Sequence, residues 1–273
     1  MREEQDRREL LELAVELGQQ AAALLMAGVD RVRESIDTKS TGTDMVTEMD
    51  RASEALLVEG ILARRPDDGI LGEEGADHPS RSGVRWVIDP LDGTTNYIYG
   101  HPGFAVSIGI ERLDAASGSA TSLVGVVVDP MHGDVFTAVA GAGAFRNEQP
   151  ITCSTQASLG QALLGTGFSY DPARRAKQAQ VLTTVLPRVR DIRRMGAAAV
   201  DLCSVACGRL DALYEKGLAP WDYTAGALIA REAGAVVTDL EGGPPSPAFT
   251  LAAPVALVDD LRSLLQAAAA GDA

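Results

Sequence analysis

The sequence is poor in cysteine, histidine and aromatic residues. It has 3 cysteines and 3 histidines among 273 residues, and aromatic residues make up 4%. An odd, sparse set of cysteines without paired spacing argues against a disulfide framework. Cys203 and Cys207 lie four residues apart in an alanine-rich segment with no histidine nearby, so we expect buried helix residues there rather than a zinc site. These features predict a cytoplasmic protein in a reducing environment.

Long apolar runs are also missing. No run of about 18 or more apolar residues, the length that spans a membrane, occurs in the sequence. The first ten residues, MREEQDRREL, are charged from the start and have no apolar signal core. We therefore expect neither a transmembrane helix nor a signal peptide.

Positive charge is scarce relative to negative charge. The chain has 38 acidic and 24 basic residues, and its net charge is −14. A surface this acidic repels a phosphate backbone, which argues against direct nucleic-acid binding. The excess of acidic residues also attracts divalent cations. An anionic substrate would need metal ions to bridge it to the protein.

Hydrophobic residues make up 46% of the chain, which is enough to bury a sizeable core. Leucines at helical spacing predict a helix over residues 5–27, and a second helix is expected over about 46–64. Short β-branched segments bounded by turn signals follow and predict an antiparallel sheet. These segments are 69–72, 84–88, 105–112, 123–129 and 135–140.

After about residue 150, strands and helices alternate, which predicts an α/β layer. Strands are expected at 162–168, 191–195, 210–215 and 235–240, and helices at 172–190, 197–208, 222–234 and 257–270. We therefore divide the chain into two closely packed halves. Residues 1–150 form an α+β half with the antiparallel sheet and the metal site, and residues 151–273 form an α/β half that completes the active site.

The segment WVIDPLDGTTNY, residues 86–97, places Asp89 and Asp92 at the end of a buried apolar strand. A buried carboxylate is costly unless a partner offsets its charge, and two carboxylates this close can share a cation. With the Leu91 carbonyl they offer hard oxygen ligands, which suit Mg²⁺ rather than zinc. The turn from Gly93 to Asn96 then offers backbone N–H groups to an anion. The alternative, an ordinary β-turn, stays open on this segment alone.

Three other segments carry candidate side chains. In GILGEEGAD, Glu73 follows a short strand and can point into a cleft, while we expect Glu74 to lie in a solvated loop. In APWDYTAGALIAREAG, Asp222 is a candidate helix N-cap that could also ligate a metal. In KSTGTDMVTEMD, Lys39 could attract phosphate, and Asp50 has a solvated helix face as its alternative.

Together these segments resemble a known family. GEEG, WVIDPLDGTTNY and PWDYTAGALIAREAG stand in the order, and near the separations, seen in inositol monophosphatases, and RRMGAAAVDLCSVACGRLDALYEKG is similar to that family's second half. The resemblance covers roughly Lys39 to Asp239. It implies an α+β and α/β fold, a layered α/β/α/β/α sandwich of the inositol monophosphatase and fructose-1,6-bisphosphatase type, usually as a homodimer. It also implies a Mg²⁺-dependent, lithium-sensitive phosphatase.

The resemblance assigns roles residue by residue. Asp50 and Thr94 would orient and deprotonate the attacking water, and Glu73 is counted with them as catalytic. The ligands of two to three Mg²⁺ ions would be Glu73, Asp89, the Leu91 carbonyl, Asp92 and Asp222. The substrate-binding residues would be Lys39, Glu73, Leu91, Asp92, Gly93, Thr94, Gly196, Ala197, Ala198, Glu215 and Asp222.

The implied reaction is hydrolysis of a phosphate monoester by direct attack of water, foremost inositol 1-phosphate to inositol and phosphate. The substrate would be a small phosphorylated polyol or amino alcohol. L-histidinol phosphate, or another small phosphomonoester, stays an alternative because Glu215 could also meet a cationic amine. The family usually has a hydroxyl residue where this chain has Ala197, so ring contacts can differ. A regulatory, protein-binding role is an alternative of a different class.

Overall fold

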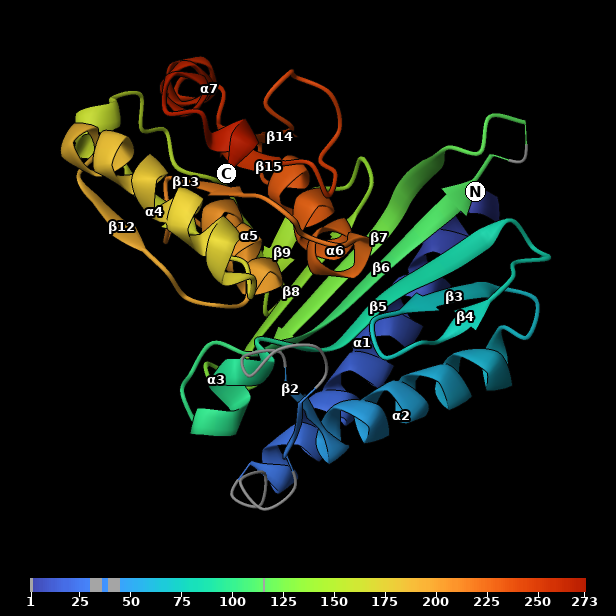
Figure 1. The fold of residues 1–273 in the computed structure, drawn as a ribbon. Coiled ribbons are helices and arrows are strands. Elements are labelled where there is room, and N and C mark those ends of the chain that lie inside the picture. Colours follow the sequence, from blue (N-terminus) through green and yellow to red (C-terminus); the bar gives the residue numbers. More distant parts are fainter. Residues whose placement is uncertain (1, 30–35, 39–44, 115) are drawn as a thin grey trace.

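Five layers of helix and sheet build the molecule, as seen in a computed structural model that describes residues 2–29, 36–38, 45–114 and 116–273 (Figure 1). Two helices cover one face of a large sheet, two lie between it and a smaller sheet, and two lie outermost. In this order they are α1 (Arg2–Gly28), α2 (Glu48–Arg64), α5 (Ala198–Ala206), α6 (Pro220–Glu232), α4 (Pro172–Val185) and α7 (Val258–Ala267). The expected sandwich is confirmed.

The large sheet has the strand order β10-β9-β8-β7-β6-β5-β3-β4. Its strands are β3 (Gly69–Gly72), β4 (Asp77–His78), β5 (Val84–Asp92), β6 (Ala105–Leu113), β7 (Ala120–Asp129), β8 (Asp134–Val139), β9 (Ala144–Arg146) and β10 (Gln149–Ile151). The expectation of an antiparallel sheet is wrong for one pair, since β3 and β5 run parallel. After β3 the chain returns through β4 at the sheet edge, so β5 starts again from the same end as β3.

The small sheet has the order β12-β11-β13-β15-β14 and is mixed. Its strands are β11 (Leu163–Thr166), β12 (Asp191–Arg193), β13 (Ala212–Glu215), β14 (Ala235–Thr238) and β15 (Thr250–Pro254). β11 is parallel to β12 and β13, whereas β15 is antiparallel to β13 and β14. Sequence analysis missed β15, because its segment TLAAP is short, fully buried and without alternation.

Further short elements were not expected from the sequence. They are the strands β4, β9 and β10 of the large sheet, β1 (Ile36–Thr38) paired with β2 (Met45–Thr47), and α3 (Thr94–Tyr99) directly after β5. In the described residues, 3-10 turns lie at Leu159–Gln161, Leu186–Arg188 and Ala270–Asp272. Of these elements, α3 carries Thr94 of the site described below.

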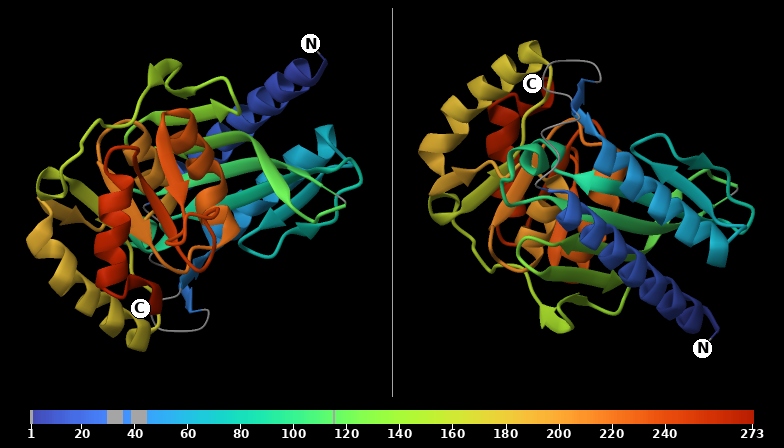
Figure 2. Two further views of the ribbon diagram at one scale, coloured as in Figure 1. Left: turned by 90° about the horizontal axis from the view of Figure 1, so that it is seen from above. Right: turned by 90° about the horizontal axis from the view of Figure 1, so that it is seen from below.

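Helix α1 is long and apolar enough to cross a membrane by length and composition alone. In this fold its apolar face belongs to the core. Leu10, Ala14, Ala21 and Leu25 are at most 1% exposed, and the helix packs on β6 and β7 beside α2 (Figure 2).

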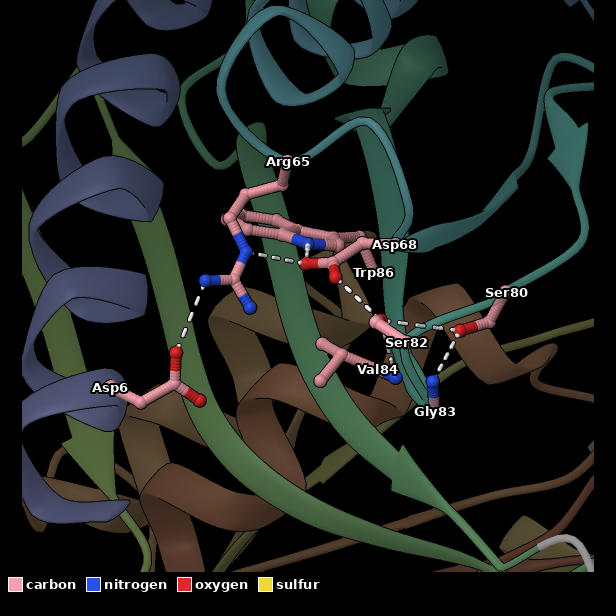
Figure 3. Close-up of polar contacts among 8 residues, drawn as sticks. All are labelled: Asp6, Arg65, Asp68, Ser80, Ser82, Gly83, Val84 and Trp86. Atoms are coloured by element: carbon pink, nitrogen blue, oxygen red, sulfur yellow. Dashed lines mark hydrogen bonds and ion pairs between the residues drawn. The ribbon is translucent and has the colours of Figure 1, made fainter. Parts of the chain in front are cut away.

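A buried carboxylate anchors the start of β5. Asp68 accepts hydrogen bonds from Trp86 Nε1 at 3.0 Å, Arg65 Nε at 2.9 Å and Ser82 Oγ at 2.6 Å (Figure 3). Arg65 also contacts Asp6 of α1 at 3.1 Å. The network thus ties both covering helices to the beginning of the strand whose other end carries the candidate site.

Two glycines let α6 approach the large sheet closely. A β-carbon at Gly109 in β6 would collide with Cγ2 of Thr224, and one at Gly125 in β7 would lie 2.7 Å from the carbonyl oxygen of Ala225. Such a separation is not tolerated for a real side chain. The missing side chains therefore set how close the first turns of α6 come to the strands.

Candidate active site

A pocket of about 400 Å³ lies where the end of β5 meets α5, α6 and the end of β13. Eleven of the residues singled out from the sequence line it, namely Glu73, Asp89, Leu91, Asp92, Gly93, Thr94, Gly196, Ala197, Ala198, Glu215 and Asp222. Asp50 lies beneath the pocket, next to Thr94. Lys39 falls outside the described residues.

The parallel pairing of β3 and β5 brings Glu73 to the same sheet edge as Asp89. Gly72 pairs with Ile88, and the backbone N–H of Glu73 donates to the Ile88 carbonyl at 3.3 Å. The carboxyl ends of parallel neighbours meet at one edge, so the residues that follow them lie side by side. The feature of the sheet that the sequence did not predict is therefore the one that positions Glu73.

Asp92 connects the large sheet to α5. The strand was expected to stop at Ile88, but β5 runs through Asp92 with a register irregularity after Asp89. The Asp92 carboxylate accepts the backbone N–H groups of Ala198 at 3.2 Å and Ala199 at 2.7 Å. These belong to the first turn of α5, whose own N-cap residue makes no side-chain cap. A carboxylate is favoured there by the unpaired N–H groups and the helix dipole.

Asp222 lies inside α6 rather than before it. The N-cap position belongs to Ala219, and Pro220 takes the first helical position, which suits a residue without an N–H. The Asp222 carboxylate reaches back and accepts the Ala219 N–H at 2.7 Å. The N-cap prediction for Asp222 is therefore wrong by three residues, although its side chain still serves the helix start and faces the pocket.

Thr94 lines the pocket and contacts Asp50, which lies behind it. Gly93, with φ 85°, is the N-cap of α3, and a β-carbon there would lie 2.8 Å from the Gly103 carbonyl oxygen. Thr94 follows it. Its Oγ1 lies 3.1 Å from the Leu91 carbonyl oxygen and 3.5 Å from Asp50 Oδ2. Asp50 is 0% exposed, so the solvated-face alternative is wrong.

Enclosure of so many carboxylates shapes their acidity. Burial first, and then the negative charges of Glu73, Asp92 and Asp222, raise the pKa of Asp89 well above its usual value. Burial likewise raises the pKa of Asp92 to about 7 and that of Glu215 to about 7. A carboxylate cluster in which like charges and burial oppose ionisation favours a cation that offsets its charge.

The chemistry of the donors fits Mg²⁺. Glu73, Asp89, Asp92, Asp222 and the Leu91 carbonyl offer only hard oxygen ligands. Over the described residues, no group of three or more acidic, histidine or cysteine side chains is arranged to hold an ion as it stands. Backbone N–H groups occupy one lone pair on several of these oxygens, and a carboxylate keeps others for a cation.

Sequence reasoning missed several residues of the site. Glu54 of α2 accepts the N–H groups of Glu74 at 2.9 Å and Ala76 at 3.1 Å, and so fixes the turn that follows Glu73. Arg174 and Arg194 also line the pocket. Glu54 gives no local signal, because its partners are about twenty residues away. The two arginines stand in charged segments that look solvated.

Comparison with known proteins gives a consistent result. A model described as "Inositol monophosphatase family" matches residues 6–271. An inositol-1-monophosphatase of Mycobacterium bovis is 42% identical, with 94% of this chain and 93% of that protein covered. A protein named Nus factor SuhB from Pasteurella multocida is 39% identical over 86% of each chain. The crystal structure of the extragenic suppressor protein SuhB from Bartonella henselae matches with a TM-score of 0.87, 33% identity, and 94% of this chain and 98% of that one covered.

Proposed function

The chain belongs to the inositol monophosphatase family, and from this premise we propose that it hydrolyses inositol 1-phosphate to inositol and phosphate with Mg²⁺. Family membership supports phosphatase chemistry, and the family is generally Mg²⁺-dependent. One observation carries the proposal. A single pocket is lined by acidic residues that the family resemblance selects from three distant parts of the sequence, namely Glu73, Asp89, Asp92, Glu215 and Asp222.

The cation ligands in this proposal are Glu73, Asp89, the Leu91 carbonyl, Asp92 and Asp222, for two to three Mg²⁺ ions. Bound there, Mg²⁺ supplies charge neutralisation for the phosphoryl group and a lowered pKa for water. The protein's own task is to hold these oxygens in place. It does so through the bonds of Asp92 to α5 and of Asp222 to the start of α6.

Thr94 and Asp50 act on the attacking water. The Thr94 hydroxyl has one proton and two acceptors within reach, Leu91 O and Asp50 Oδ2. We assign its proton to Asp50, so that the Thr94 oxygen lone pair receives the proton of the water. Asp50 is buried against this hydroxyl and exchanges protons with it rather than with solvent. The backbone N–H groups of Gly93 and Thr94 are assigned to the phosphate.

Glu215 and the segment Gly196–Ala198 bind the alcohol part of the substrate. Both line the pocket and lie far from the β5 carboxylates in sequence. A carboxylate accepts hydrogen bonds from two neighbouring hydroxyl groups of a polyol. For Lys39 we propose, from the sequence alone, a role as a basic residue near the phosphate.

The test is phosphate release from a panel of esters with and without Mg²⁺. The panel contains myo-inositol 1-phosphate, L-histidinol phosphate, fructose 1,6-bisphosphate and 3′-phosphoadenosine 5′-phosphate. Preference for the inositol ester supports the proposal. Preference for another ester keeps the chemistry and changes the substrate, and Mg²⁺-independent or absent release from all four contradicts it.

Two finer expectations, a homodimer and inhibition by Li⁺, come from the family resemblance, and a cytoplasmic location is expected from the composition. We propose all three. Light scattering on the purified protein tests the dimer, and titration of the Mg²⁺-supported activity with LiCl tests the inhibition. A monomer at micromolar concentration, or activity unchanged by Li⁺, would contradict the respective expectation.

A second role is supported by the names of several relatives. Proteins named Nus factor SuhB are 37–39% identical over 86% of this chain. We propose that a surface of this chain binds a protein partner independently of turnover. Affinity capture with the wild type and with an inactive variant tests it. Equal capture of the same partner by both supports this role, and no retained protein contradicts it.

A further inference from the structure

Two arginines line the pocket together with the acidic residues. Arg194 follows β12 directly, and Arg174 lies in the first turn of α4. Both line the pocket. A β-carbon at Gly196 would collide with Nη1 of Arg194, and one at Gly217 would lie 2.7 Å from Nη2 of Arg174. Each guanidinium group therefore lies close over a glycine in the pocket wall.

Both guanidinium groups keep their hydrogen-bond donors available for a ligand. Among the described residues, Arg174 and Arg194 form no ion pair and no hydrogen bond, whereas the neighbouring Arg193 pairs with Asp191 at 2.7 Å. Arg194 is exposed and Arg174 is half-buried, so a ligand in the pocket can reach both. The charge of Arg194 nevertheless reaches into the site, where it opposes the burial that raises the pKa of Glu215.

Balancing the charge of Glu215 does not account for this arrangement. A side chain placed for that purpose forms an ion pair, and none forms between Arg194 and Glu215 in the part of the chain described. In a protein with net charge −14, two pocket arginines that form no ion pair or hydrogen bond with the described residues point to an anionic ligand.

We propose that Arg174 and Arg194 bind a second anionic group of the substrate, a phosphate or a carboxylate on its alcohol part. The guanidinium group presents a planar fork of donors that matches either anion. This inference rests on the proposed phosphatase function and names its substrate class, phosphate monoesters that carry another negative group. The carboxylates of the pocket need bound cations before an anionic group can lie beside them, whereas Arg174 and Arg194 can bind an anionic group directly.

The test uses two matched substrate pairs, each differing by one anionic group. The first is inositol 1,4-bisphosphate against inositol 1-phosphate, and the second is 6-phosphogluconate against sorbitol 6-phosphate. Phosphate release is measured with Mg²⁺ for the wild type and for Arg174→Ala/Arg194→Ala. The matched control is Arg175→Ala/Arg193→Ala, which removes the same charge from adjacent exposed positions that do not line the pocket.

We expect the wild type to prefer the doubly anionic member of at least one pair. In the pocket double variant, kcat/KM for that member falls about tenfold or more, as expected for lost charge-assisted hydrogen bonds. The singly anionic member falls by less, since it loses only the effect of Arg194 on Glu215. The control variant changes neither beyond about twofold. If the doubly anionic member has the higher kcat/KM in one pair and not in the other, that pair identifies the second group as phosphate or as carboxylate.

The failures are distinguishable. If inositol 1-phosphate is hydrolysed but the pocket and control variants behave alike on both pairs, this inference is wrong and the proposed function stands. If no ester releases phosphate, both are wrong. Arg174→Gln/Arg194→Gln, which keeps most of each side chain's packing, and thermal unfolding curves ensure that a loss is not due to misfolding.

Discussion

The two walls of the pocket are built in different ways. The wall at the end of β5 carries the buried carboxylates of Asp89 and Asp92, whose oxygens accept backbone N–H groups. The wall on the small sheet carries charges of both signs, with Glu215 half-buried and Arg194 exposed. A rigid, uniformly acidic wall suits the invariable part of a substrate, its phosphate. A wall with accessible, mixed charges suits the part that differs between substrates.

The largest effect should follow a change in the acidic wall. Asp92→Asn removes a proposed cation ligand and turns an amide N–H toward a helix N–H, so kcat/KM should fall at least about 10²–10³-fold on every ester. Steady-state phosphate release measures it. Asp68→Asn, a buried aspartate at the other end of β5, is the control and should lower stability without this loss in the folded protein. Retained Mg²⁺-dependent turnover in Asp92→Asn contradicts the assignment.

A smaller loss is expected from Thr94→Val, which removes the hydroxyl and keeps the shape. Loss of a positioned proton acceptor should lower kcat about 10²-fold with little change in KM. The adjacent Thr95→Val is the matched control, since its hydroxyl faces Tyr170 rather than Asp50. Equal losses in both variants would mean that packing, and not proton transfer, explains the effect.

A change in the wall on the small sheet, which carries Glu215, should alter which substrate the enzyme prefers. Glu215→Gln removes a charge but keeps the shape, so kcat/KM for inositol 1-phosphate should fall about tenfold through weaker hydroxyl contacts. Para-nitrophenyl phosphate, which offers no hydroxyls, should lose much less. A comparison of the two substrates on one protein preparation is sufficient. Equal losses on both would remove the distinction between the walls.

The sequence predicted the acidic wall better than the two pocket arginines. Asp89, Asp92 and their turn stand in one short motif, and Glu73 and Asp222 adjoin glycine or proline signals at element ends. The helices over 5–27 and about 46–64 correspond to α1 and α2, because their apolar faces repeat at helical spacing. The roles assigned to these residues stay proposals.

What was missed depends on pairing between distant segments. The parallel partnership of β3 and β5, the insertion of β15 between β13 and β14, and the cap that Asp92 gives to α5 leave no local pattern. Arg174 and Arg194 were not considered for the site, because charged residues in polar segments are usually solvated. Their position over Gly217 and Gly196 exists only in the folded chain.

The smallest predicted effect concerns Ala197, the N-cap of α5, where the family usually has a hydroxyl residue. Its backbone is extended, with φ −143° and ψ 104°, so Ala197→Ser can accept a helix N–H without strain. A new cap typically adds about 1 kcal/mol to the free energy of unfolding. Asp92 already accepts two N–H groups of this turn, so we expect about half that gain, measured by urea unfolding.

The same substitution in the Asp92→Asn background makes the test specific. There the helix start has lost its carboxylate, and Ala197→Ser should then add the full gain of about 1 kcal/mol. A double-mutant cycle from four unfolding curves measures this coupling. An identical gain in the free energy of unfolding in both backgrounds would show that Asp92 does not cap α5. Asp92 would then not couple the end of β5 to that helix.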